Sequence, residues 1–118
     1  IVKKGLENCE FTVVHAHSLN ATAQMADVVL PVQTIAERDG SLTNVERRVQ
    51  RFWKSFEIGP DVQPDWLVFQ HISALLGCMM PYFSVRDISR EIASSVPGYA
   101  GCSLRDLGDT GVRWTYSA

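Results

Sequence analysis

The sequence predicts an α/β fold with a parallel sheet and flanking helices. Two short apolar runs, residues 9–17 and 27–32, are rich in β-branched side chains, as buried strands are. A polar stretch between them can form a short helix, which Asn20 is placed to cap. Strand, helix and strand within about 25 residues make a βαβ unit, the usual connection between parallel strands.

Composition limits the classes of function. The chain has 118 residues, 46% of them hydrophobic, and a formal net charge of −2, as expected of a globular domain. This balance provides no basic face, so we expect no nucleic-acid partner. No apolar run approaches the roughly 20 residues of a membrane-spanning helix. The sequence starts at Ile1, without a methionine, in what reads as the tail of a helix, and it ends just after an aromatic turn, so we expect it to be a fragment of a longer chain.

The three cysteines give no sign of a metal site. Cys9, Cys78 and Cys102 lie far apart and form no close pair, so we predict buried or half-buried thiols. His15 and His17 point to one face of a strand end, but no third ligand is near them in sequence. A surface pair is therefore favoured over a metal site. We predict no catalytic residue and no metal ligand in this chain.

Two helices are predicted in the second half. The first begins at Pro64 and Asp65, with Asp65 as its cap, and ends at Gly77. The second begins at Ser84 and ends at Pro97-Gly98. The first helix carries one apolar face, formed by Val68, Phe69, Ile72, Leu75 and Leu76. The second helix carries a buried apolar stripe, formed by Val85, Ile88, Ile92 and Val96. We therefore divide the chain into residues 1–58, a strand–helix–strand portion with a charged loop, and residues 59–118, a linker and a helical segment that packs on it.

A charged loop follows the second predicted strand. Residues 33–58 lack a helical period and are predicted to be extended or irregular chain lying over a surface. Gly40 follows Asp39 and is expected to form a tight turn with a positive φ. Arg47 and Arg48 could hold phosphates or carboxylates, and the amides of Asn44 and Gln50 could bind a polar ring edge or a backbone. On composition alone, a solvated loop whose charges pair with each other is favoured over a ligand site.

Two linked motifs resemble the molybdopterin oxidoreductase superfamily. They are Ala23-x-x-Ala26-Asp27-Val28-Val29-Leu30-Pro31 and Glu37-x-x-Gly40-x-x-x-Asn44-x-Glu46-x-Arg48-x-Gln50. Residues 64–66 and 91–101 are similar as well, so the resemblance covers about residues 11–107. It implies part of a Rossmann-like parallel-sheet domain. In catalytic relatives, loops at the carboxyl ends of its strands hold a bis-molybdopterin guanine dinucleotide.

A departure from the family pattern bears on the cofactor. Cofactor-binding relatives typically have an acidic residue and then Thr-Glu-Thr after the first strand. Here Ala16 and Ala21 stand where carboxylates are expected, and Thr22 alone is retained. Methyl groups accept no hydrogen bond from a guanine or pterin edge. The resemblance therefore favours the large iron–sulfur subunit of bacterial NADH:quinone oxidoreductase (complex I), in which the related domain is a scaffold without the cofactor.

Membership of complex I implies several properties. Electrons would pass from NADH to quinone through iron–sulfur clusters elsewhere in the full chain, and this segment would hold no cofactor. Its partners would be the rest of its own chain and other subunits of a respiratory complex. The location would be cytoplasmic, on the inner face of the cell membrane. The charged loop would then be an internal brace, in which Asn44, Glu46, Arg48 and Gln50 join the loop to the domain.

Two alternatives stay open. The first is a molybdenum or tungsten bis-molybdopterin oxidoreductase, such as a formate dehydrogenase, in which Thr22, Asn44 and Arg48 would contact the cofactor. The second is a free-standing binding module, which the small predicted core disfavours.

Overall fold

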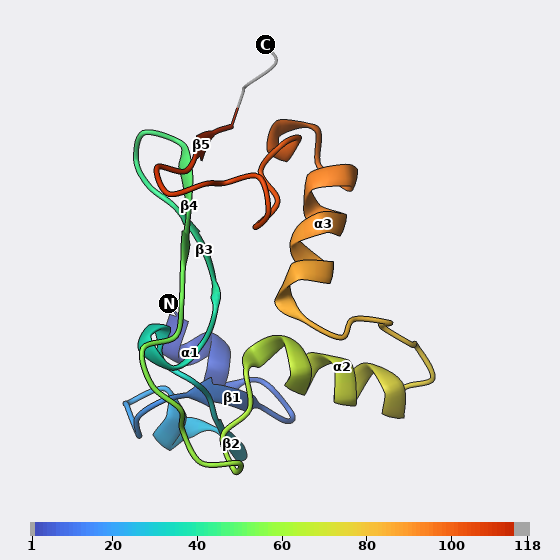
Figure 1. The fold of residues 1–118 in the computed structure, drawn as a ribbon. Helices are drawn as coiled ribbons and strands as arrows, with labels where there is room; N and C mark the ends of the chain where they lie inside the picture. Colours follow the sequence, from blue (N-terminus) through green and yellow to red (C-terminus); the bar gives the residue numbers. More distant parts are fainter. Residues whose placement is uncertain (1, 115–118) are drawn as a thin grey trace.

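The computed structural model describes residues 2–114, which form two small sheets and their flanking helices (Figure 1). Along the chain the elements are α1 (Val2–Glu7), β1 (Val13–Ala16), η1 (Ala23–Met25), β2 (Val28–Pro31), η2 (Ile35–Glu37), β3 (Gly40–Thr43), β4 (Arg48–Phe52), α2 (Asp65–Leu75), α3 (Val85–Ser95), η3 (Pro97–Tyr99) and β5 (Val112–Arg113), where η marks a single 3-10 turn. The predicted α/β class with a parallel sheet and flanking helices is confirmed. None of the helices in the described part of the chain is long and apolar enough to cross a membrane.

The parallel sheet consists of β1 and β2, as the sequence predicts. Its register runs from Val13 opposite Val28 to Ala16 opposite Pro31. The connection contains η1, and the Asn20 side chain accepts hydrogen bonds from two backbone amides at its start, both at 3.0 Å. The prediction of buried strands is wrong, because every residue of β1 and β2 is exposed or half-buried in the described structure.

The charged segment forms a β-hairpin, whereas the sequence predicted extended or irregular chain. Strands β3 and β4 pair antiparallel, and β5 adds to β4, so the second sheet has the order β3-β4-β5. Gly40 pairs with Phe52 and lacks the predicted positive φ. It is buried, and a Cβ there would lie 2.7 Å from Cζ of Phe52. Gly40 therefore makes room for a ring on the neighbouring strand and does not make a turn.

Both long helices lie close to their predicted bounds. Helix α2 ends where Gly77 takes a φ of +78°, which suits a residue without a Cβ. The predicted cap is wrong, because Pro64 occupies the N-cap position and Asp65 is the first helical residue. Helix α3 begins directly after Ser84, as predicted. Its predicted buried stripe is only half-buried at Val85 and Ile88 and exposed at Ile92 and Val96.

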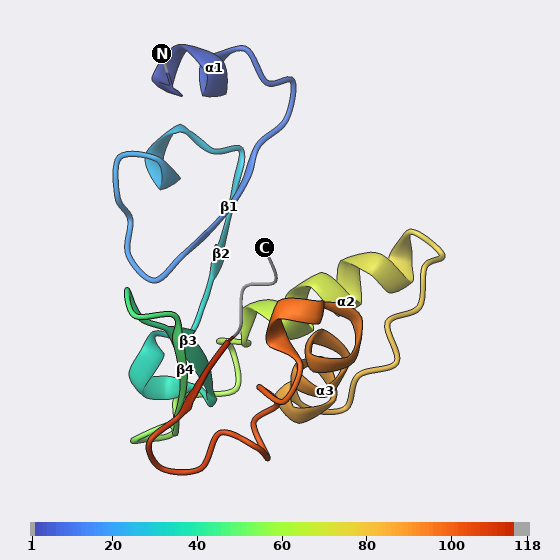
Figure 2. The same ribbon diagram turned by 90° about the horizontal axis from the view of Figure 1, so that it is seen from above.

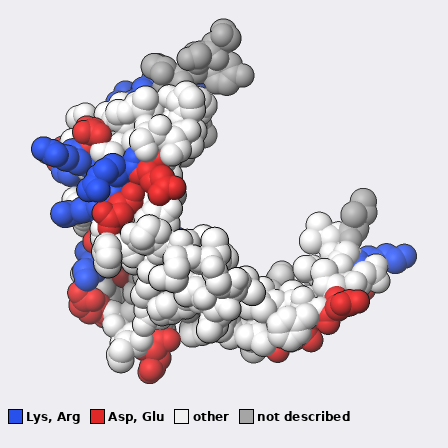
Figure 3. Space-filling view, turned by 90° about the vertical axis from the view of Figure 1, so that its right-hand side faces the viewer, with Lys and Arg blue, Asp and Glu red and all other residues white. Residues whose placement is uncertain are grey.

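The main hydrophobic core lies between the antiparallel sheet, α3 and the segment that follows η3. It contains Val49, Cys102, Leu104 and Leu107, with Val85, Tyr99, Val112 and Trp114 packed against it. The layer of α1, β1 and β2 projects away from this core (Figure 2). The space-filling view shows the resulting crescent-shaped outline (Figure 3). The chain is therefore built from an antiparallel core region and a thinner parallel-sheet layer.

Candidate functional site

Three polar side chains meet at the carboxyl edge of the parallel sheet. His15 lies near the end of β1, Arg38 follows η2, and Asp65 begins α2. The two oxygens of the Asp65 carboxylate have different partners. Oδ1 lies 3.2 Å from Nδ1 of His15, and Oδ2 accepts a hydrogen bond from Nη1 of Arg38. We refer to these three residues as the edge cluster.

Local structure explains how α2 reaches this edge. A parallel bridge between Val32 and Gln63 places the start of α2 beside the chain that leaves β2. Asp65 is two residues after Gln63, so this bridge also brings Asp65 close to the carboxyl end of β2. The ring of Phe69, one helical turn further along α2, stacks on His15 with centroids 5.1 Å apart. This contact fixes the orientation of the imidazole beside the carboxylate.

The segment before Arg38 is also held in place. The backbone amide of Thr34 donates to Oε2 of Glu37 at 2.7 Å, and the amide of Glu37 donates to the Thr34 carbonyl at 3.1 Å. These bonds close η2. The amide of Ser55 donates to the Ala36 carbonyl at 2.7 Å and ties the turn to the chain after β4. Arg38 therefore leaves a fixed turn and extends toward Asp65.

The edge cluster keeps unused hydrogen-bonding capacity. Its three side chains are partly buried, and their two mutual contacts leave free lone pairs on Asp65, since a carboxylate has about four acceptor positions. Arg38 has further N–H groups in its planar fork. Arg38 and Asp65 also line a pocket of about 280 Å³, which reaches toward Trp66 and the hairpin. The cluster can thus offer both an acceptor and a cation to one ligand.

The three predicted cofactor contacts lie in different places. Thr22 is exposed in the connection after β1, where its amide donates to the Asn20 side chain. Asn44 and Arg48 lie at the turn of the hairpin, beside β5 and away from the parallel sheet (Figure 1). The structure therefore brings Asn44 and Arg48 together but leaves Thr22 apart from them.

Asn44 and Arg48 make bonds within the antiparallel sheet. Oδ1 of Asn44 accepts from the amides of Glu46 and Arg48, at 2.9 and 3.0 Å. Nη1 of Arg48 donates to the Gly111 carbonyl at 3.3 Å. These contacts resemble the internal brace that the sequence predicted. The side chains of Glu46 and Gln50 are exposed, so the brace involves fewer side chains than predicted.

Sequence reasoning missed the edge cluster because it assigned its members separately. His15 was expected to form a surface pair with His17, and Asp65 was expected to cap a helix. His17 is exposed, whereas His15 contacts Asp65. The run Pro64-Asp65-Trp66 could have indicated the edge cluster, because it resembles the family pattern and the sequence gives this run no other functional role.

Metal-ligand candidates are sparse in the described part of the chain. No group of three or more His, Cys, Asp or Glu residues among the described residues is arranged to hold a metal ion. Cys9 and Cys78 are exposed, so the prediction of buried or half-buried thiols holds only for Cys102.

Comparison with known proteins identifies relatives over nearly the whole chain. The family model described as "Molybdopterin oxidoreductase" matches residues 1–75. An "F420-dependent formate dehydrogenase 2 subunit alpha" from Methanococcus maripaludis is 41% identical over 115 residues, which are 96% of this chain and 17% of that protein. Proteins named "Putative formate dehydrogenase" from Staphylococcus aureus and Staphylococcus haemolyticus are each 40% identical over 114 residues, 96% of this chain and 12% of theirs.

These relatives correct the main functional prediction. The sequence favoured the large iron–sulfur subunit of complex I, whereas the relatives carry the name formate dehydrogenase. The prediction failed because it sought carboxylates only in the loop after β1, where Ala16 and Ala21 stand. The structure places the carboxylate of Asp65 against His15, the residue before Ala16. A carboxylate therefore reaches this edge from a helix about 50 residues later in the chain.

Proposed function

Because this chain belongs to the molybdopterin oxidoreductase family, we propose that it is the segment of a formate-dehydrogenase-type enzyme that holds the nucleotide end of a molybdopterin cofactor. One observation carries this proposal: the edge cluster lies at the carboxyl ends of parallel strands, where open α/β sheets bind their ligands. The names of the relatives support the reaction class, since both contain the words formate dehydrogenase. The chain spans only 12% to 17% of the length of these relatives, so the activity belongs to the whole protein.

The edge cluster fits the nucleotide end of such a cofactor chemically. A guanine edge presents N–H donors side by side, and the Asp65 carboxylate can accept from them. The Arg38 guanidinium is suited to a phosphate oxygen, which it can bind through two parallel N–H groups. When bound, the cofactor would supply the metal centre for formate oxidation. The residues of this chain would bind and orient its nucleotide end.

We propose separate roles for the three contacts predicted from sequence. Thr22 lies in the connection that leaves the carboxyl end of β1, where its exposed side chain is available to the same ligand. Asn44 and Arg48 are engaged in bonds within the hairpin. We therefore assign them a positioning role in which they hold the antiparallel sheet in shape.

We propose that the full-length protein works with partner subunits. The relative from Methanococcus maripaludis is named as a subunit alpha, so it belongs to an assembly of several chains. Other parts of the polypeptide and its partners would supply the electron-transfer groups. A cytoplasmic location and the division into residues 1–58 and 59–118 stay predictions.

The test uses the full-length protein that contains this chain. We expect molybdenum or tungsten and pterin in stoichiometric amounts, together with formate-dependent reduction of a viologen dye. The substitution Asp65→Ala should lower cofactor affinity at least about tenfold, because charge-assisted hydrogen bonds are lost. The readout is pterin per protein after extensive dialysis. Asp61→Ala, at an exposed position before α2, is the matched control and should retain the pterin.

Two results would count against the proposal. The first is a full-length protein that folds yet contains neither metal nor pterin. The second is an Asp65→Ala variant that keeps its pterin as firmly as the control does.

A further inference from the structure

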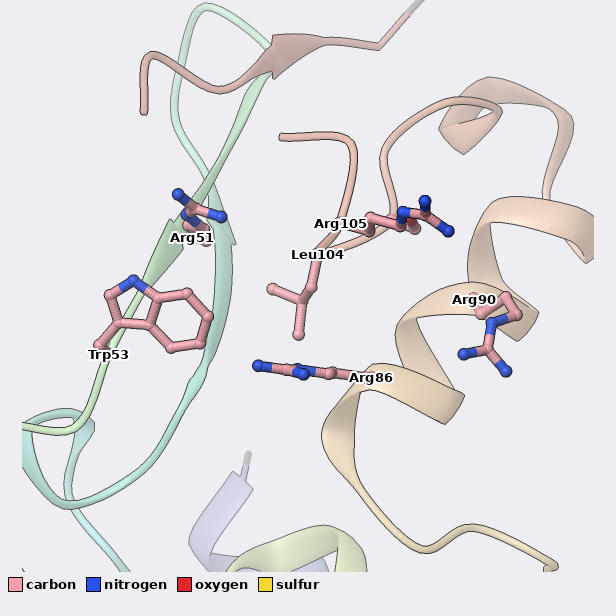
Figure 4. A pocket seen from close by; sticks show the side chains of 7 residues that line it. Arg51, Trp53, Arg86, Arg90, Leu104 and Arg105 are labelled. Carbon is pink, nitrogen blue, oxygen red and sulfur yellow. The ribbon is translucent and has the colours of Figure 1, made fainter. Parts of the chain in front are cut away.

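A second pocket lies between β4, α3 and the segment after η3 (Figure 4). Its volume is about 440 Å³, and it shares no residue with the edge cluster. Four arginines line it, together with an indole, a serine and a leucine: Arg51, Arg86, Arg90, Arg105, Trp53, Ser103 and Leu104. The arginines come from three separate segments, so the fold brings them together.

The pocket has an excess of positive charge. Arg51 pairs with Asp109 at 2.9 Å, and Arg90 lies 3.5 Å from Asp87. Arg86 and Arg105 have no ion pair or hydrogen bond through their guanidinium groups with any of residues 2–114. A third carboxylate, that of Asp106, accepts a hydrogen bond from the Ser103 hydroxyl in the lining, so four guanidinium groups and three carboxylates leave 4 − 3 = 1 positive charge, in a chain whose overall charge is −2. Like charges in a hollow repel each other, and an anion relieves that repulsion.

The side chains are arranged around a shared space. Arg86 extends from α3 toward Trp53, and Arg90 and Arg105 lie on the side away from the indole (Figure 4). Arg51 covers the Trp53 ring at 5.2 Å from its centroid. The indole is still 48% exposed, so part of it remains available to a planar group. The pocket thus combines an aromatic wall with the Arg86 guanidinium extended toward it, while Arg90 and Arg105 lie farther from the indole.

We propose that this pocket binds a phosphate-bearing ligand of about nucleotide size. Guanidinium groups bind phosphate oxygens in pairs, and the indole can stack on a base. The volume falls within the roughly 300–1,000 Å³ of small-molecule sites. An acidic peptide would need a longer cationic groove than this pocket of about 440 Å³ offers. This second site does not rest on the proposed cofactor role of the edge cluster.

The experiment measures binding to the full-length protein by calorimetry, with pyrophosphate and ADP as probes. The double substitution Arg86→Ala/Arg105→Ala should weaken both probes at least about tenfold, because it removes charge-assisted bonds. The matched control is Lys4→Ala on α1, which removes a positive charge far from the pocket and should change binding less than twofold. Trp53→Leu should weaken ADP severalfold and leave pyrophosphate unchanged.

Further measurements separate this site from the edge cluster and from a folding defect. The pterin content of the double variant should equal that of the wild type, whereas Asp65→Ala should not alter pyrophosphate binding. If the double variant fails to fold, Arg86→Lys replaces it. Arg86→Lys keeps the positive charge but loses the planar guanidinium, so the binding of both probes should weaken by a smaller factor than in the double variant.

Several outcomes would overturn the proposal. The proposal is overturned if the wild-type protein binds neither pyrophosphate nor ADP. It is also overturned if a folded double variant binds both probes as tightly as the wild type does. Binding of poly-glutamate without binding of either phosphate probe would instead assign the pocket to an acidic protein partner. Loss of pterin in the folded double variant would assign it to the resident cofactor.

Discussion

At Gly111, a single added methyl group would meet the backbone of the neighbouring strand. Gly111 has a φ of +72°, and a Cβ there would lie 2.3 Å from the Val49 carbonyl oxygen. The Gly111 carbonyl also accepts the hydrogen bond from Arg48. This residue therefore determines how closely β5 approaches β4, and through Arg48 it affects the hairpin turn.

The substitution Gly111→Ala should destabilise the protein more than the same change at Gly108. Gly108 also has a positive φ, +56°, but nothing lies within 4 Å of its added Cβ. We expect about 1–2 kcal/mol for the left-handed backbone at Gly108. Gly111→Ala should cost at least about 1 kcal/mol more, because the backbone of β4 must shift. Thermal unfolding of both variants measures the difference, and equal midpoints would contradict this explanation.

The three cysteines should differ in reactivity. Burial raises the pKa of the Cys102 thiol, and the nearby Asp106 carboxylate adds to the effect. A raised pKa lowers the thiolate fraction at a given pH, and the thiolate is the reactive form. At pH 8, we expect iodoacetamide to modify Cys9 and Cys78 well before Cys102, with all three modified in urea. Mass spectrometry of peptides gives the order, and early modification of Cys102 in folded protein would be the contrary result.

At the scale of elements, the start of α3 depends on one carboxylate. Oδ2 of Asp87 accepts from the Ser84 hydroxyl at 3.0 Å and from the Phe83 amide at 3.1 Å. The hydrogen bond from Ser84, followed by that from Phe83, lowers the pKa of Asp87 below its ordinary value of 3.8. This residue therefore stabilises the fold fully above about pH 4, and the contribution is lost as the pH falls through the lowered pKa.

The substitution Asp87→Asn tests this dependence. The variant should unfold at a lower temperature than wild type at pH 7, because the charge that accepts both bonds is gone. The difference in unfolding temperature between wild type and variant should narrow as the pH falls below 4, because Asp87 of the wild type becomes protonated. Asp61→Asn removes an exposed charge outside the helices and should show no such convergence. A gap for Asp87→Asn that stays constant from pH 7 to pH 2 would contradict the prediction.

The elements also show what sequence patterns can predict. Local signals predicted β1, β2 and both long helices, since an apolar run, a cap residue or a glycine marked each one. The hairpin was missed because charged residues interrupt its alternation and because β4 pairs with β5, about 60 residues later. The edge cluster was missed for the same reason, since His15 and Asp65 are 50 residues apart. Contacts over such separations leave no periodic signal in a single sequence.

At the scale of the whole molecule, the chain is more open than a compact domain of its length. Its radius of gyration is 16.7 Å, whereas size scaling gives about 13.5 Å for a compact chain of this length. Its accessible surface is 8,671 Å², against about 6,400 Å² for a folded protein of this mass. Much apolar surface is therefore left uncovered, and α2 carries a large part of it. Its predicted apolar face ends in Leu75 and Leu76, which are 87% and 80% exposed.

We expect the remainder of the full-length polypeptide to cover this end of α2. The double substitution Leu75→Ser/Leu76→Ser should lower the thermal midpoint and the soluble yield of the full-length protein, because burying a leucine contributes about 1.5–3 kcal/mol. In the 118-residue chain alone, the same change should leave unfolding nearly unaltered, since both side chains already face solvent. Val45→Ser, at the exposed hairpin turn, is the control and should be neutral in both proteins. If the leucine substitutions were equally neutral in both, α2 would remain open to solvent in the full-length protein, and its apolar face would have to be explained without a covering segment.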